Sequence, residues 1–199
     1  MANTDTIYIA KNAAPLVNPT SATVFQVTDT VAHPTLAAAI YLPDYESYPA
    51  SGTISTEAPP SPAINAPQGV TQWNVRVKGR VTVGTSGTFT LAVQYGNSVT
   101  QASNTALVTL QSAVTYASAT NNFVNSFFLT WDPVSLLLSG STGAGIQGST
   151  RAIPTATVIA GVASVNLIGN KVGLVVTALF GTSNTGNIAY LDEFSVEQV

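Results

Sequence analysis

The clearest strand pattern in the sequence runs from Trp73 to Tyr95, WNVRVKGRVTVGTSGTFTLAVQY. Its first half alternates apolar residues at odd positions with polar residues at even positions, and the alternation resumes at Phe89. A period of two is typical of a β-strand with one buried and one solvated face. Because only Gly84-Thr85-Ser86-Gly87 separates the two runs, the pattern predicts a β-hairpin. We expect the following residues to line the interior: Trp73, Val75, Val77, Phe89, Leu91 and Val93.

More strand patterns follow at short intervals, separated by residues that favour turns. They cover Thr105–Ala117, Asn122–Trp131, Val134–Ser139, Ala156–Leu167, Lys171–Phe180 and Asn187–Glu197. About eight strands without a convincing helix predict an all-β fold, an antiparallel β-sandwich or jelly roll, over residues 70–199. The glycine-rich stretch 139–154 is long enough to be mobile or to bind something.

Residues 1–69 differ in composition and are predicted to form an extended, proline-rich N-terminal arm. They hold nine of the 11 prolines but only two of the 15 glycines, Gly52 and Gly69. Proline removes backbone donors, so we expect short strands at Thr6–Ala10 and Ala22–Thr28, and a helical turn at Thr35–Tyr41. The arm is too apolar for a solvated linker, which favours contacts with neighbouring subunits. The alternative is that the arm folds back on its own sandwich.

Composition limits the class of protein. The chain has 199 residues, no cysteine and 8% charged residues, against about 25% charged residues in typical soluble domains. Its 45% apolar content argues against disorder. Its most apolar stretch, Val158–Phe180, is interrupted by polar and glycine residues, so no helical membrane span is expected. A charge-poor, apolar chain often covers its surface with partners, so we expect a homo-oligomeric assembly subunit.

The charge limits the classes of partner, and the first residues indicate where the chain is made. The net charge of −3 argues against a general nucleic-acid binder. Three of the six basic residues, Arg76, Lys78 and Arg80, share one strand face. This face is either a small anion- or partner-binding stripe or, as we favour, a solvated face beside acids such as Glu193 or Glu197. The first residues show no basic and apolar signal segment, so we expect cytoplasmic synthesis.

The residues that could support catalysis are few. His33 is the single histidine, so one chain cannot form a two-histidine zinc site, and no Gly-x-Ser-x-Gly motif is present. Asp44 and Glu46 are suitably spaced for a glycosidase pair but lie in the proline-rich arm. Asp192 and Glu193 are adjacent on a predicted strand and should therefore point to opposite faces. We expect no catalytic residue, metal ligand or cofactor-binding residue, and no enzymatic activity.

The final strand pattern, NIAYLDEFSVE from Asn187 to Glu197, resembles the closing strand of carbohydrate-binding jelly-roll modules. The resemblance implies that Asp192 can help to bind a structural calcium ion. Strand alternation places Asp192 on one face with apolar residues, where a carboxylate needs hydrogen bonds or a cation. Backbone N–H groups or a hydroxyl group would serve this purpose as well as calcium.

The whole chain has a second resemblance. A cysteine-free, charge-poor jelly roll rich in Gly, Ser, Thr and Asn, behind a proline-rich arm, resembles bacteriophage virion proteins such as capsid decoration (cement) proteins and some coat or fibre subunits. The resemblance rests on no single motif and carries over no residue. It implies a virion protein that binds the major capsid protein or other virion subunits, commonly as a trimer, and reinforces the outer shell non-covalently.

We therefore predict a non-enzymatic capsid decoration protein with no nucleic-acid or membrane partner and no cofactor. The alternative is a carbohydrate-binding or receptor-binding jelly-roll module, such as a phage fibre or tail domain. A sugar platform requires Trp or Tyr rings on an open face. Trp73 and Trp131 lie within apolar alternation, which favours the core, although Trp131 stands at a strand end where it can be partly exposed.

Overall fold

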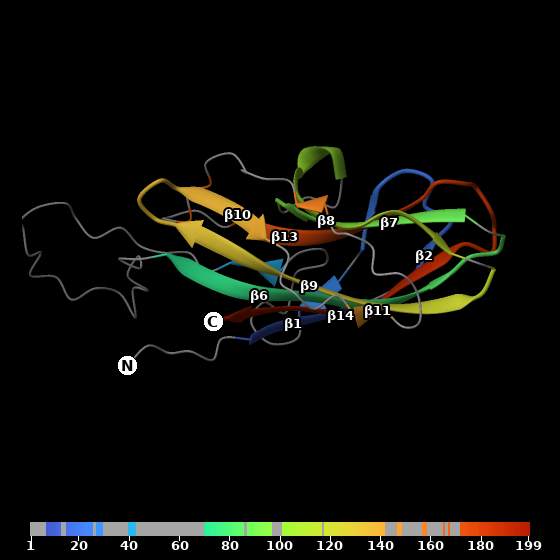
Figure 1. Ribbon diagram of the computed structural model, residues 1–199, viewed down its shortest axis with the longest axis horizontal. Helices are drawn as coiled ribbons and strands as arrows, with labels where there is room; N and C mark the ends of the chain where they lie inside the picture. The colour runs from blue at the N-terminus through green and yellow to red at the C-terminus, as the bar shows by residue number, and fades with distance from the viewer. Residues whose placement is uncertain are drawn as a thin grey trace, which may run out of the picture.

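The computed structural model describes residues 7–12, 15–25, 27–29, 40–42, 70–85, 87–96, 101–116, 118–141, 147–148, 157–158, 165, 167 and 172–199. These residues form two antiparallel β-sheets that face each other (Figure 1). Helical structure in this part of the chain is limited to one short 3-10 turn, Gln101–Ser103. The predicted all-β sandwich is thus confirmed.

Each sheet combines segments that are far apart in the sequence. Sheet A contains, in spatial order, β10 (Leu137–Ser141), β9 (Thr120–Asp132), β6 (Thr71–Thr82), β14 (Ile188–Gln198), β1 (Ile7–Asn12) and β4 (Val27–Asp29), with β11 (Gln147–Gly148) beside β9 and β2 (Leu16–Val17) beside β14. Sheet B contains β12 (Thr157–Val158), β8 (Thr105–Tyr116), β7 (Gly87–Tyr95), β13 (Gly173–Phe180) and β3 (Thr23–Val24), with β5 (Ile40–Tyr41) also beside β13.

The strand pairs are nested, which identifies the sandwich as a jelly roll. The outermost pair joins β1 to β14, and the next joins β3 to β13. Within these, β6 pairs with β9 and β7 pairs with β8. The four pairs alternate between sheet A and sheet B, as expected for a chain folded back on itself and then rolled into two facing sheets.

Strands β1 to β5 come from residues 1–69, the segment predicted to form an N-terminal arm. Strand β1 pairs with β14, while β3 and β5 pair with β13. The N–H groups of Phe25 and Leu42 donate hydrogen bonds to the carbonyls of Val176 and Val172, both at 2.9 Å. The described part of residues 1–69 therefore folds onto its own sandwich, which was the alternative interpretation. Ile40 and Tyr41 form a strand and not the expected helical turn; residues 35–39 and 43–69 lie outside the described residues.

The predicted hairpin between Trp73 and Tyr95 is wrong, although both of its strands exist. Strand β6 pairs with β14 and β9 in sheet A, whereas β7 pairs with β13 and β8 in sheet B. The short connection at Gly84 crosses from one sheet to the other. Alternation specifies which face a strand buries but not its hydrogen-bonding neighbour, so the same pattern fits a hairpin and a crossing between sheets.

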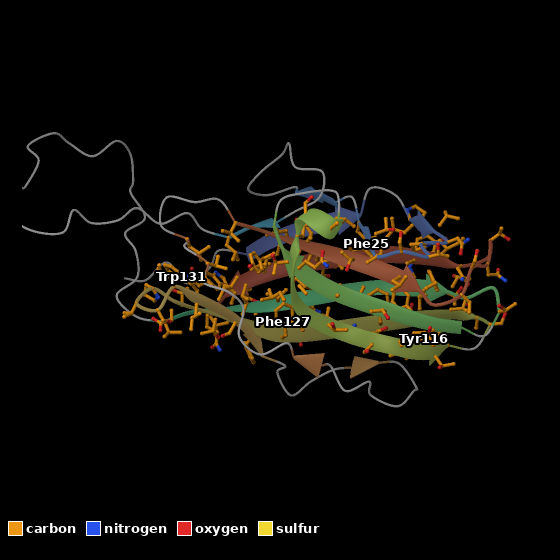
Figure 2. The ribbon with its side chains drawn as sticks, turned by 90° about the horizontal axis from the view of Figure 1, so that it is seen from above. Phe25, Tyr116, Phe127 and Trp131 are labelled. Carbon is orange, nitrogen blue, oxygen red and sulfur yellow. The ribbon has the colours of Figure 1, made fainter. Side chains whose placement is uncertain are left out.

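The inner faces of the two sheets form one hydrophobic core. All six residues predicted to line the interior are fully buried, which confirms that expectation. Phe89 of β7 is central: its ring centroid lies 5.2 Å from that of Phe180, 5.9 Å from Phe123 and 6.2 Å from Tyr116. Figure 2 shows that the core runs along the length of the sandwich, with Trp131 near one end and Tyr116 near the other.

Asn125 on β9 is an unusual polar residue in this core. Its side chain is 1% exposed, and neither its amide nitrogen nor its oxygen has a hydrogen-bond partner in the described structure. It lies opposite Val77, a buried residue of β6. A buried polar group without a partner loses its hydration and gains nothing in return.

Replacing Asn125 by leucine is therefore expected to stabilise the protein. The substitution keeps a side chain of similar length and removes two unsatisfied polar atoms, so the free energy of unfolding should rise by about 1–3 kcal/mol. Urea denaturation measures this change. Asn125→Ala is the matched control, because it also removes the amide but leaves a cavity. Lower stability of Asn125→Leu than of the wild type would contradict the expectation.

Asp132 closes the turn between β9 and β10. Its carboxylate accepts a hydrogen bond from the hydroxyl of Ser135 at 2.6 Å and one from the backbone N–H of Val134 at 2.9 Å. These bonds, that of Ser135 first, stabilise the charged form and lower the pKa of Asp132 below its ordinary value of 3.8.

The depressed pKa predicts an acid-dependent contribution to stability. Because the pKa is lower in the folded than in the unfolded chain, the contribution is complete above pH 3.8 and is lost as the pH falls through the folded-state pKa. Asp132→Ala should thus be less stable than the wild type near neutral pH, and the gap should close in acid. NMR titration of the Asp132 carboxyl carbon tests the cause directly: a pKa at or above the ordinary value would refute it.

Candidate interaction surface

Most of the charged side chains that the structure describes lie on the outer face of sheet A. Six charged residues lie on the neighbouring strands β6 and β14: Arg76, Lys78, Arg80, Asp192, Glu193 and Glu197. On β6 the buried and exposed residues alternate strictly, so the three basic side chains share the exposed face. Among residues with described side chains, the other charged one is Asp132 in the β9–β10 turn. We call these six residues the charged face.

A β-bulge on β14 brings two adjacent acids to this face. The register between β14 and β6 shifts between Leu191 and Glu193. Leu191 is buried before the shift and Phe194 after it, a spacing of three residues where a regular strand has two. The extra residue lets Asp192 and Glu193 both lie on the outer side. The expectation that these two acids point to opposite faces is therefore wrong, as is the placement of Asp192 among core-facing apolar residues.

Asp192 forms an ion pair with Arg80 of β6. The Nη2 of Arg80 lies 2.8 Å from Oδ1 of Asp192, and its Nε donates to both carboxylate oxygens at 3.1 and 3.0 Å. The hydrogen bond to Asp192 and its negative charge raise the pKa of Arg80 above its ordinary value. The guanidinium carbon also lies 4.6 Å from the ring centroid of Tyr190, in a cation–π contact. Asp192 was expected to need hydrogen bonds or a cation, and the guanidinium group of Arg80 provides both.

The other four residues of the charged face form no salt bridge in the described part of the chain. Lys78 lies opposite Glu193 in the strand register, and Arg76 lies opposite Ser195. The ion pair between Arg80 and Asp192 is the one salt bridge in the described part of the chain. Glu193 accepts a long hydrogen bond, 3.5 Å, from the hydroxyl of Ser195. Arg76, Lys78 and Glu197 are exposed, as expected for a solvated basic strand beside acidic neighbours and equally for a partner-binding stripe.

The residues considered for catalysis fall mostly outside the described residues. This applies to His33, Asp44 and Glu46, and to most of the stretch 139–154. Within the described ranges, no three residues of the types His, Cys, Asp and Glu cluster as they would to hold a metal ion.

Both tryptophans belong to the core. Trp73 and Trp131 are fully buried, and the indole N–H of Trp131 donates to the carbonyl of Val165 at 2.9 Å. The partial exposure considered for Trp131 at its strand end is therefore not found. Neither ring is available to stack on a sugar at the surface.

An uncharged network of asparagines ties the loops at the Gly84 end of the sandwich, and sequence reasoning missed it. Asn187, which is 1% exposed, accepts a hydrogen bond from the N–H of Gly84 and donates one to the carbonyl of Thr182. Asn18 accepts from the N–H of Asn184 at 2.9 Å and donates to Ser183 at 3.0 Å. Because their amides are engaged within the chain, these asparagines act as structural ties between loops.

Across the described ranges, no helix has the length and apolar character that crossing a membrane requires. Comparison of the chain with protein-family models, with curated proteins and with solved structures finds no match.

Proposed function

We propose that the chain is a non-enzymatic structural protein of a virus particle, a capsid decoration protein that binds and stabilises the outer capsid shell. The observation that carries the proposal is the jelly-roll topology of a charge-poor, cysteine-free chain. Jelly rolls are common in viral capsid proteins, although they also occur in lectins and cupins. Because a fold alone does not specify function, the surface must support the proposal as well.

The described surface is consistent with a protein that functions by docking on other subunits. Six of the seven charged side chains that the structure describes lie on one sheet face, where Arg80 and Asp192 form an ion pair. The asparagines of the loop network use their amides to tie the chain to itself. A body that presents a charged sheet face, with uncharged described loops at its Gly84 end, fits a subunit that docks on a regular array of partners. In this proposal the partners are the major capsid protein and other copies of the chain, and the protein resides in the virion.

The alternative of a glycan-binding module receives less support. Its usual platform is an exposed tryptophan or tyrosine, and both tryptophans are in the core. Tyr190 is partly exposed, but the guanidinium group of Arg80 lies over its ring.

Co-sedimentation with capsids tests the proposed function. The purified chain is mixed with capsids assembled from the major capsid protein that is encoded in the same genome. We expect saturable binding at a fixed ratio of chain to capsid protein. Capsids of an unrelated virus serve as the control. A glycan array is probed in parallel, and binding to a glycan without binding to capsids would overturn the proposal in favour of the alternative.

A further inference from the structure

The charged face carries an inference about self-association. Arg80 and Asp192 neutralise each other within the chain. This leaves two exposed cations on β6, Arg76 and Lys78, and two acids on β14, Glu193 and Glu197, with no salt bridge among these four in the described structure. We call Arg76 and Lys78 the basic row and Glu193 and Glu197 the acidic row. The two rows lie on adjacent, antiparallel strands.

In one orientation of two copies, the basic row of each copy lies against the acidic row of the other. A two-fold axis that runs parallel to the strands, above the line between β6 and β14, turns the face over onto a second copy. This rotation exchanges the two strands, so β6 of one copy lies over β14 of the other at the same height along the strand. Lys78 then faces Glu193 of the second copy, because the register already places these residues at one level. Arg76, opposite Ser195, falls between the two acids.

The other face-to-face orientation is unfavourable. A two-fold axis across the strands would place β6 over β6 and β14 over β14, so cations would face cations and acids would face acids. Like charges brought together at a contact are repulsive and select against that arrangement. Facing sheets pack about 10 Å apart, a gap that a lysine and a glutamate side chain can span together.

We propose that two copies of this chain associate face to face through the outer surface of sheet A, with the basic row of each copy against the acidic row of the other. The contact is isologous, as in most two-fold homodimers. A purely anionic partner fits less well, because Glu193 and Glu197 lie beside the cations and would repel it. The inference does not rest on the capsid proposal: a soluble dimer can form whether or not the chain binds a capsid.

Complementary charge reversal tests this contact sharply. In Lys78→Glu both rows become acidic near the centre, and in Glu193→Lys both become basic, so each variant alone should be monomeric. Mixed in equal amounts, the two variants should form a heterodimer, because each reversed residue then faces an opposite charge. Sedimentation velocity at low ionic strength measures the mass. We expect a wild-type dimer at low salt, at least tenfold weaker association of each single variant, and recovery on mixing.

Two controls separate the contact from general effects. Lys78 and Glu193 also lie opposite each other within one chain, so a charge reversal could destabilise the monomer itself. Thermal unfolding of each variant checks that the monomer remains folded. Raising the salt concentration to about 1 M shortens the Debye length to about 3 Å and should dissociate the dimer. A wild-type monomer at low salt, a dimer that either reversal leaves intact, or single variants that stay monomeric when mixed would each overturn the proposal.

Discussion

Removal of residues 1–42 is expected to leave a chain that cannot fold on its own. These residues supply β1 to β5, which pair with β13, with β14 or, in the case of β4, with β1. They also place Phe25, Ile40 and Leu42 in the core, where each is at most 3% exposed. The deletion would open the core and uncover the long strands β13 and β14 at the same time.

The expected loss is comparable to the whole stability of a domain. Burial of a large apolar side chain contributes about 1.5–3 kcal/mol, so these three account for about 5–9 kcal/mol. Typical domains are stable by about 5–15 kcal/mol in total. The newly exposed strand edges would in addition favour aggregation.

Circular dichroism and thermal denaturation of residues 43–199 measure this outcome. We expect no cooperative unfolding transition and a strong tendency to aggregate. Deletion of residues 1–6, which precede β1, is the matched control and should retain a cooperative transition. A soluble 43–199 chain with native β-sheet signal and cooperative unfolding would show that the first strands are dispensable, and would restore the interpretation of a separable arm.

Replacing Gly79 by valine is expected to have the second largest effect. Gly79 occupies an inward-facing position of β6 where a side chain has no room. An added Cβ would overlap the backbone carbonyl oxygen of Tyr190 and lie 2.5 Å from Cζ of Phe123. The carbonyl belongs to the neighbouring strand β14, so it cannot move without disturbing the pairing beside the bulge.

We expect a loss of about 3 kcal/mol or more, at the upper end of overpacked cores. The midpoint of urea denaturation measures this loss. Gly87→Ala is the matched control, because the nearest atom to its added Cβ is the hydroxyl oxygen of Thr182, at 2.7 Å, and a hydroxyl group can rotate away. Equal stability of Gly79→Val and the wild type would mean that β6 and β14 are further apart than described here.

The sequence predicted which residues are inside better than it predicted which strands are neighbours. The alternation around Trp73 and Phe89 correctly assigned six core residues, because the side-chain period depends only on the strand itself. The pairing of β6 with β14 joins residues more than a hundred positions apart. Such a choice depends on the topology of the whole chain, which a local pattern does not contain.

The proline-rich beginning of the chain was misjudged for a related reason. Proline weakens a central strand, but the strands of this segment are short and several lie at sheet edges. Near Pro19 the chain still contributes to the sheet, because the carbonyl of Pro19 accepts a hydrogen bond from the N–H of Phe180 at 2.7 Å. A missing donor does not prevent a residue from acting as an acceptor.

The charged face was predicted in part. The basic row on β6 and its acidic neighbours follow from the sequence, whereas the partnership of Arg80 with Asp192 depends on the bulge. One sequence signal for the bulge was available: Leu191 and Phe194 are three residues apart, although regular alternation would separate two inward-facing residues by two. That spacing indicates an irregular strand, but it does not identify the partner strand against which the extra residue is inserted.

The proposal that the chain stabilises an outer capsid shell is best tested by the temperature at which that shell is disrupted. Capsids assembled from the major capsid protein of the same genome are heated with and without a saturating amount of the purified chain, and release of packaged nucleic acid is followed with a fluorescent dye. We expect the chain to raise the temperature of release, because a ligand that binds only the intact shell stabilises it by mass action. An unchanged release temperature under conditions in which the chain is folded and saturating would contradict the claim.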